Sequence, residues 1–241
     1  MDEHLRFEFL KYLVRDAKEC RVRGVMESQL PPLKDLGQEL GVSVSRLREQ
    51  LQVAKTLGLV DARPRVGIRR LDYNFAPAVA QSLFYAVALD WDYFVAFSDL
   101  RNHIEAAYWF DAIERLTPHD HGRLRVLVER AWEKLRGYPV QIPHAEHREM
   151  HMLFFKHLDN PFVLGILEAY WDAYEAVGLN LYTDYGYLEQ VWSYHGQIVE
   201  AICSGDFDKS HEALTKHTDL LFHRADTDIH DEDVLEESVS K

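Results

Sequence analysis

The chain has 241 residues, of which 47% are hydrophobic and 12% aromatic, and it carries a formal net charge of −13 at pH 7. These proportions exclude a wholly disordered chain, and the length suffices for one large or two small domains with buried cores. No stretch approaches the 18 or so uncharged apolar residues that a transmembrane helix needs, so we expect no transmembrane helix.

The negative charge is unevenly distributed along the chain. Residues 1–72 carry a net charge of +3, whereas the remainder carries −16. A basic first part and an acidic second part indicate two domains with different partners. We therefore expect a first domain over residues 1–72, a linker over 73–80, a second domain over 81–223 and a disordered acidic tail over 224–241.

The N-terminal residues and the cysteines bear on the cellular compartment. The chain starts without the basic segment, apolar run and cleavage site of a secretory signal. Cys20 and Cys203 lie far apart in sequence and form neither a disulfide framework nor a metal-binding Cys-x-x-Cys motif. We therefore expect a cytoplasmic protein in a reducing environment.

The first 72 residues contain the pattern of helix, helix, helix and hairpin. Apolar residues Leu5, Phe9, Leu13 and Ala17 recur at helical spacing, and Ser43 is the expected N-cap of a later helix. Two more helices are predicted over 33–40 and 44–57, and two strands over 59–63 and 68–71. This is the layout of a winged helix-turn-helix with a small β-hairpin wing, which binds DNA through its third helix. From the pattern alone, a plain packing or dimerisation module remains the alternative.

Four segments of this part resemble the DNA-binding domain of GntR-type bacterial transcription regulators. They are residues 30–43, 48–51 (Arg-Glu-Gln-Leu), 58–60 (Gly-Leu-Val) and the wing 63–68 (Arg-Pro-Arg-Val-Gly-Ile). The resemblance implies that Lys34, Arg48 and Gly67 occupy positions used at the DNA. The family commonly begins its recognition helix with Ser-Arg-Thr-Pro, whereas this chain has Ser-Val-Ser-Arg at 43–46, so the operator preference does not transfer. The predicted DNA-contacting residues are Lys34, Ser43, Ser45, Arg46, Arg48, Arg65 and Gly67.

The rest of the chain has almost no strand alternation and predicts an all-α antiparallel helical bundle with a central cavity. Thr117 and Asn160 each precede a proline, which is typical chemistry for the start of a helix. The whole chain is thus expected to be mainly α. The candidate helices are 79–89, 92–116, 118–135, 144–158, 161–181, 184–204 and 206–222.

Four histidines of the bundle are candidates for a metal site. His147 and His151 are four residues apart and share one helix face. His195 and His217 lie at similar distances on either side of the turn at Gly205, so two antiparallel helices would bring them to one height. Neutral imidazoles suit zinc, nickel, copper or iron. The alternative is that these are ordinary surface histidines.

The bundle is similar to the FCD ligand-binding domain of FadR-like GntR regulators. The similar segments are 100–105 (Leu-Arg-Asn-His-Ile-Glu), 147–151, 160–161, 195–198 (His-Gly-Gln-Ile), 205–206 and His217. In metal-binding members an aspartate and three histidines hold the ion, and by position His151, His195 and His217 match the histidines. His147 takes the aspartate's place. A fourth imidazole leaves a divalent site at +2 instead of +1, which favours a softer ion or tighter anion capture, or else weakens binding. A divalent transition metal, zinc or nickel above all, is the cofactor that the resemblance implies.

Arg101 matches the arginine near the ligand cavity of that family. A guanidinium binds a carboxylate through two hydrogen bonds, so the resemblance implies a small carboxylate effector at Arg101. The competing role is a structural pair with Glu105, one helical turn further on.

These features together predict a homodimeric, metabolite-responsive regulator that binds a double-stranded DNA operator and has no membrane partner. A small organic acid beside a divalent metal would change operator affinity. The alternatives are a metal-sensing repressor, a helical metalloenzyme and a purely structural protein. We do not expect an enzyme, because the paired Glu-x-x-His motifs of di-iron bundles are missing and no general base other than Glu146 or Glu149 lies close in sequence to the histidines.

Overall fold

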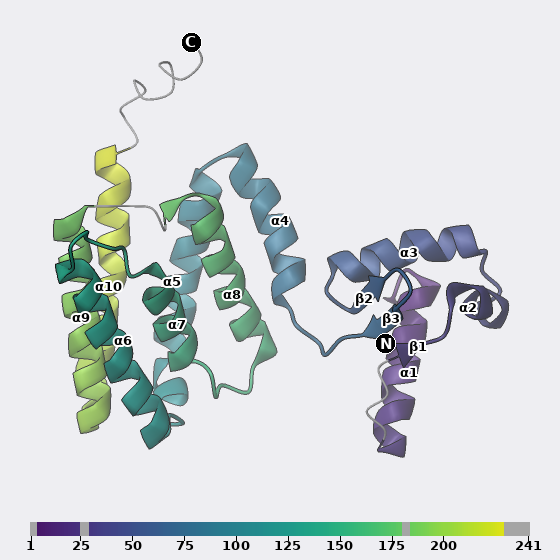
Figure 1. The fold of residues 1–241 in the computed structure, drawn as a ribbon, viewed down its shortest axis with the longest axis horizontal. Coiled ribbons are helices and arrows are strands. Elements are labelled where there is room, and N and C mark those ends of the chain that lie inside the picture. Colours follow the sequence, from purple (N-terminus) through teal and green to yellow (C-terminus); the bar gives the residue numbers. More distant parts are fainter. Residues whose placement is uncertain (1–3, 25–28, 180–183, 229–241) are drawn as a thin grey trace, which may run out of the picture. The chain divides into compact units, whose positions relative to one another are not determined.

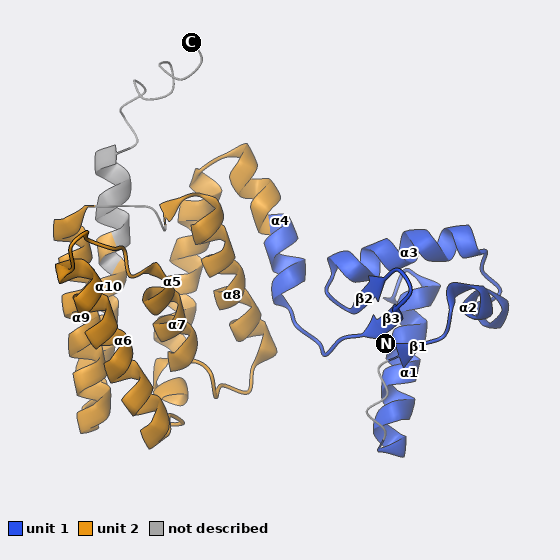
Figure 2. Ribbon diagram, in the orientation of Figure 1, with its two compact units in different colours: residues 1–82 blue, residues 83–241 orange. Residues whose placement is uncertain are grey.

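The chain forms two compact units, residues 1–82 and 83–241, which are called here the head unit and the helical unit (Figures 1 and 2). The computed structural model describes residues 4–24, 29–179 and 184–228. Each unit has a hydrophobic core of its own, and the mainly α fold class is confirmed. The two units meet in sequence within helix α4 (Ala76–Leu89), which begins three residues before the predicted helix and inside the expected linker.

The head unit is a three-helix domain with a small antiparallel sheet. Phe9, Leu36 and Leu47 come from three different helices. All three are fully buried in one hydrophobic cluster, which forms the core of the unit. The sheet has the strand order β1-β3-β2, with all pairs antiparallel. Its elements are α1 (Glu8–Arg23), β1 (Gln29–Leu30), α2 (Leu33–Leu40), α3 (Val44–Thr56), β2 (Val60–Arg63) and β3 (Gly67–Arg70).

Two details of the head unit differ from the sequence prediction. Leu5 precedes α1, whose buried face is formed by Phe9, Tyr12 and Leu13. Strand β1 was not predicted, because two residues are too short to show an alternating pattern. The predicted cap of α3 is confirmed, since the Ser43 hydroxyl accepts a hydrogen bond of 3.3 Å from the backbone N–H of Arg46.

The turn between β2 and β3 forms the wing. Arg65 and Gly67 both have positive φ angles, of 65° and 96°. A Cβ atom on Gly67 would lie 2.5 Å from Nε2 of Gln29, and that same amide donates a hydrogen bond of 3.3 Å to the Val66 carbonyl oxygen. Glycine at position 67 therefore serves the tight turn that presents Arg65.

The helical unit is an antiparallel bundle of long helices (Figure 1). Helices α9 and α10 pack most closely, α6 packs on α9, and α5 packs on α10 and α8. Thr117 and Asn160 accept hydrogen bonds from the first turns of α6 and α8, so both predicted caps are confirmed. The helices after α4 are α5 (Asp92–Ile113), α6 (Pro118–Arg136), α7 (His144–Phe154), α8 (Pro161–Ala176), α9 (Tyr185–Ser204) and α10 (Phe207–Asp228).

Four helices of this unit end more than one residue away from the predicted end. Helix α5 ends at Ile113 instead of residue 116. Helix α7 ends at Phe154 instead of residue 158. The prediction ran too far because Phe155 and Leu158, which lie beyond the helix, are buried and continue its apolar pattern. Helix α8 ends at Ala176 instead of 181. Helix α10 runs to Asp228, past the predicted end at 222, so it includes the first residues of the expected acidic tail, while residues 229–241 lie outside the described part.

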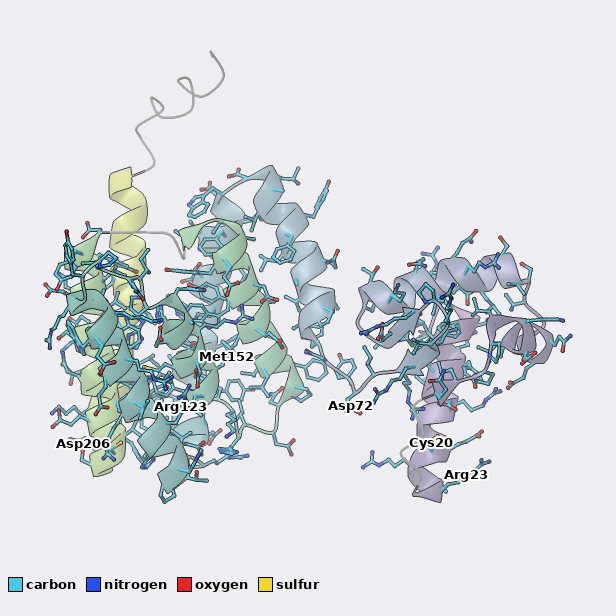
Figure 3. The ribbon with its side chains drawn as sticks, in the orientation of Figure 1. Cys20, Arg23, Asp72, Arg123, Met152 and Asp206 are labelled. Atoms are coloured by element: carbon cyan, nitrogen blue, oxygen red, sulfur yellow. The ribbon has the colours of Figure 1, made fainter. Side chains whose placement is uncertain are left out.

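None of the helices in the described part of the chain combines the length and the apolar character that crossing a lipid bilayer requires. Neither cysteine forms a disulfide bond within the described residues. Figure 3 labels Cys20 near the end of α1, in the head unit, whereas Cys203 lies on α9 in the helical unit, so they sit in separate units.

Candidate functional site

Four histidines converge inside the helical unit. His147 and His151 come from α7, His195 from α9 and His217 from α10. One nitrogen from each imidazole can be chosen so that all four lie within 4.8 Å of one another. The structure therefore brings together all four histidines that the sequence singled out, and they are called here the His cluster.

Helix geometry accounts for this convergence. His147 and His151 are one turn apart, with ring centroids separated by 5.0 Å. Gly205 adopts a left-handed conformation (φ 78°) that ends α9 and lets α10 return beside it. His195 and His217 thereby reach one height in the bundle, with ring centroids 4.3 Å apart.

The nitrogens of the His cluster fit a metal ion. Nε2 of His151 lies 3.1 Å from Nε2 of His195. Two nitrogens that share one ion at about 2.0–2.1 Å lie roughly 2.9–3.4 Å apart, so this spacing suits joint ligation. Nε2 of His147, Nδ1 of His195 and Nδ1 of His217 are buried without a hydrogen-bond partner among the described residues. A buried unsatisfied polar atom costs about 1–3 kcal/mol, which ligation of an ion would offset at the ligating positions.

Burial keeps the His cluster neutral. Desolvation lowers the pKa values of His147, His195 and His217 well below 6.5, and repulsion from neighbouring imidazoles and Arg101 adds to it. The pKa of His151 is also lowered by desolvation, against an opposing effect of Glu105. Neutral imidazoles keep the lone pairs that metal ligation needs at neutral pH.

Glu105 contacts Nδ1 of His151, the ring nitrogen that does not face His195. Its Oε1 lies 3.1 Å from Nδ1 of His151 and 2.9 Å from Nη2 of Arg101. Burial raises the pKa of Glu105, but the charges of Arg101 and His151 and their hydrogen bonds outweigh burial, so the pKa falls below 4.5 and the group is a carboxylate. A carboxylate behind a histidine is the usual support for a metal-ligating imidazole.

Arg101 and Glu105 compete for that nitrogen. Nη2 of Arg101 lies 2.8 Å from Nδ1 of His151 and can only donate. If Nδ1 accepts from Arg101, Nε2 carries the proton and faces His195. If Nδ1 instead donates to Glu105, Nε2 presents a lone pair to the centre of the His cluster. Ion binding therefore requires the second tautomer.

Arg101 is buried, with 4% of its surface exposed. Besides Glu105 and His151, it donates to Oδ1 of Asn102 at 3.0 Å and lies 4.7 Å from the ring centroid of Tyr170. Its Nε has no hydrogen-bond partner among the described residues. The pair with Glu105 is thus present in the structure, and the contact with an effector carboxylate stays a prediction.

The space beside the His cluster is small. A partly enclosed cavity of about 20 Å³ is lined by His144, His147, Tyr174 and Trp192, among others. A water molecule needs roughly 10–15 Å³ by this kind of measure, so the cavity holds about one water and no organic acid. An organic acid in this cavity would require the surrounding helices to move apart.

The two glutamates considered as possible general bases are engaged in ion pairs. Glu146 binds Nζ of Lys134 at 2.7 Å, and Glu149 binds Arg123 of α6 at 2.6 Å. Arg123 is labelled in Figure 3. Neither carboxylate belongs to the His cluster.

The seven predicted DNA-contacting residues are all exposed on the head unit. Ser43, Ser45, Arg46 and Arg48 lie at the start of α3. Lys34 belongs to α2 and Arg65 to the wing. The four cations, Lys34, Arg46, Arg48 and Arg65, form no ion pair within the described residues, so their charges are available to a partner.

Sequence reasoning missed several neighbours of the His cluster. Glu105 was considered only as a partner of Arg101, whereas it also supports His151. Trp171 packs edge-on against His147 with ring centroids 4.7 Å apart, and Tyr170 lies under Arg101. No local pattern indicates these contacts, although the spacing of Arg101 and Glu105 on one helix face was visible.

Comparison with known proteins identifies the family. The FCD domain model matches residues 97–220, which is just over half of the chain. The putative L-lactate dehydrogenase operon regulatory proteins of Escherichia coli and Shigella flexneri are each 26% identical over 215 residues, covering 83% of this chain and 82% of theirs. A GntR structure from Streptococcus agalactiae covers 88% of this chain and 97% of its own, with a TM-score of 0.65 and 16% identity, and shows the same fold.

These matches are transcription regulators rather than enzymes, which confirms the expectation that the chain is not an enzyme. GntR regulators bind DNA operators, and they are usually dimeric. The chain belongs to the FCD-domain family and is a GntR-type transcription regulator of the FadR-like branch.

Proposed function

We propose that this regulator is a metal-dependent homodimer in which residues 1–72 bind the operator and residues 81–223 bind the effector and mediate dimerisation. The single observation that carries the metal dependence is the convergence of four neutral imidazoles on one point. His147, His151, His195 and His217 would hold the ion. A divalent transition metal such as zinc or nickel would supply positive charge and an open position for an anionic ligand.

A small carboxylate is the proposed effector. Four neutral imidazoles do not compensate the charge of a divalent ion. The nearby carboxylate of Glu105 is already paired with Arg101, so the occupied site would keep a net positive charge. A buried cationic centre favours an anion. The Escherichia coli relative is named as a regulator of an L-lactate dehydrogenase operon, so L-lactate is the first acid to test.

The effector acts only if it binds one arrangement of the dimer better than another. The acid has to open the helices around the small cavity at His147, and this opening is the source of the differential affinity. The test is elemental analysis and native mass spectrometry of the purified protein, followed by operator titration with and without L-lactate. The proposal would be contradicted if the purified protein were a metal-free monomer and if neither metal nor acid changed its affinity for the operator.

A metal-sensing repressor is the second candidate, and the cavity size favours it. The cavity of about 20 Å³ beside His147 holds about one water and no organic acid, whereas the ion itself would lie among the four imidazoles. In that case the ion alone changes operator affinity. Titrating zinc or nickel against operator binding of the metal-free protein separates the two: a sensor responds without any acid, whereas a metabolite regulator needs both.

Alanine in place of Arg46 or Arg48 is expected to weaken operator binding. If the arginine contacts a base through two hydrogen bonds, its removal should cost about 1–3 kcal/mol of binding free energy and reduce sequence specificity. If it contacts a phosphate, its removal should weaken binding to all sequences alike and reduce the slope of log affinity against log salt concentration by about 1. The measurement is fluorescence anisotropy with a duplex selected by the wild-type protein from a random library. Lys55→Ala removes the same charge from the far end of α3 and is the matched control. Wild-type affinity in both arginine variants would refute the assigned surface.

Aspartate in place of His147 is expected to keep the ion but to change its preference. A carboxylate favours harder ions such as Mn²⁺ over the imidazole-preferring Ni²⁺, and it lowers the charge of the occupied site by one. We therefore expect the ratio of Ni²⁺ to Mn²⁺ affinities, measured by competition calorimetry, to fall in His147→Asp. An unchanged ratio would mean that His147 is not a ligand.

A further inference from the structure

The small cavity beside the His cluster is lined by residues at the N-terminal end of α7. It is lined by His144 in the first turn of α7 and by His147, and by none of the other three cluster histidines. His147 is also the cluster histidine that is only partly buried, whereas His151, His195 and His217 are buried. The remaining lining residues described are mostly apolar or aromatic. The side chains of His144 and His147 therefore both border this side of the His cluster.

His144 is held beside a carboxylate. Its Nε2 lies 3.0 Å from Oε1 of Glu175, and its ring stacks on Tyr174 with centroids 5.6 Å apart and planes 2° apart. The side chain of Glu175 is 42% exposed and that of His144 is 17% exposed. His144, one helical turn before His147 on α7, therefore pairs with a carboxylate of α8, and both side chains are partly exposed to solvent. Both groups are ligand types that divalent transition metals accept.

The charges around this pair favour a cation. Glu175 and Asp172 share one arginine, Arg148, at 2.8 and 2.6 Å. The hydrogen bond from His144 and the pairing with Arg148 lower the pKa of Glu175, so it is ionised at neutral pH. Two carboxylates and one guanidinium leave a net charge of −1 here while His144 is neutral. Local negative charge raises the association rate of cations.

We propose that His144 and Glu175 form a transient binding site for the divalent ion on its way to the His cluster, with His147 as the next ligand. This inference rests on the proposed metal dependence. A site on the route accelerates loading and release by the same factor, because both directions pass through it. It leaves the equilibrium affinity of the His cluster unchanged.

The experiment is rapid mixing of Co²⁺ with the metal-free, full-length protein, followed by its visible absorbance, with release measured into excess chelator. In His144→Ala and in Glu175→Gln we expect loading and release to be slower by about tenfold. The dissociation constant should stay within about twofold of wild type, since the ligands of the His cluster remain. Glu175→Gln keeps the size of the side chain, so it tests the route with the least disturbance of α8.

Two control variants isolate the effect. His119→Ala removes an exposed histidine on α6, and Glu149→Gln neutralises a carboxylate that pairs with Arg123 of α6 instead of with His144. Both should load Co²⁺ at the wild-type rate. If wild-type protein takes up no Co²⁺, the proposed metal dependence itself fails. If wild-type protein loads normally and the two route variants keep its rates, or lose affinity without slower loading, the transient site is refuted while the metal dependence stands.

Discussion

Alanine in place of His151 is expected to abolish metal retention. His151 contributes the nitrogen 3.1 Å from Nε2 of His195 and is the ring that Glu105 supports. Loss of an outer residue behind a ligand typically costs about 10–100-fold in metal affinity, so loss of the ligand itself should cost more. An ion at 1,000 times its dissociation constant stabilises the fold by about 4.1 kcal/mol, and the variant forfeits that gain. Isothermal titration calorimetry and metal-dependent thermal unfolding measure both effects.

His195→Gln is the companion variant, because glutamine keeps a polar side chain in the buried position. It should lose the ion as His151→Ala does. His119→Ala is the matched control, since it removes an imidazole from the exposed surface of the same unit. Wild-type metal content in His151→Ala would show that the ion, if any, binds elsewhere.

Acid is expected to destabilise the metal-free protein well before its carboxylates titrate. His147, His195 and His217 have folded pKa values well below 6.5, chiefly because burial disfavours their charged forms. Below pH 6.5 these histidines are protonated in the unfolded chain but stay neutral in the folded protein. Their full contribution to the free energy of unfolding is therefore present above pH 6.5 and is lost as the pH falls below this value. Each of these three histidines contributes to the loss of stability, which grows as the pH falls further below 6.5.

Urea unfolding of the metal-free protein between pH 5 and 8 measures this loss. His217→Gln removes one of the three buried titrating rings, so its stability should fall less steeply with acid than that of wild type. Saturating Zn²⁺ should shift the loss to lower pH, because protons then compete with the ion. A free energy of unfolding that is flat from pH 8 to 5 would contradict neutral buried histidines.

Local patterns predicted most helices because each carries a repeating apolar face and definite end signals. Ser43, Thr117 and Asn160 were recognised as caps from their types and positions. The ends of α7 and α8 were placed too late, since the apolar residues that follow α7, such as Phe155 and Leu158, are buried in turns rather than helices. A pattern of burial shows which residues face the core but not the backbone conformation that puts them there.

The sequence by itself determined the two-part charge, the helix positions and the four histidines at spacings that allow one site. It determined these because capping, periodicity and charge are local properties. Only the tertiary structure decided that Glu105 and Arg101 compete for His151, that the cavity beside His147 is the size of a water, and that His144 stands beside Glu175. These contacts join helices distant in sequence, and their distances depend on how the whole bundle packs.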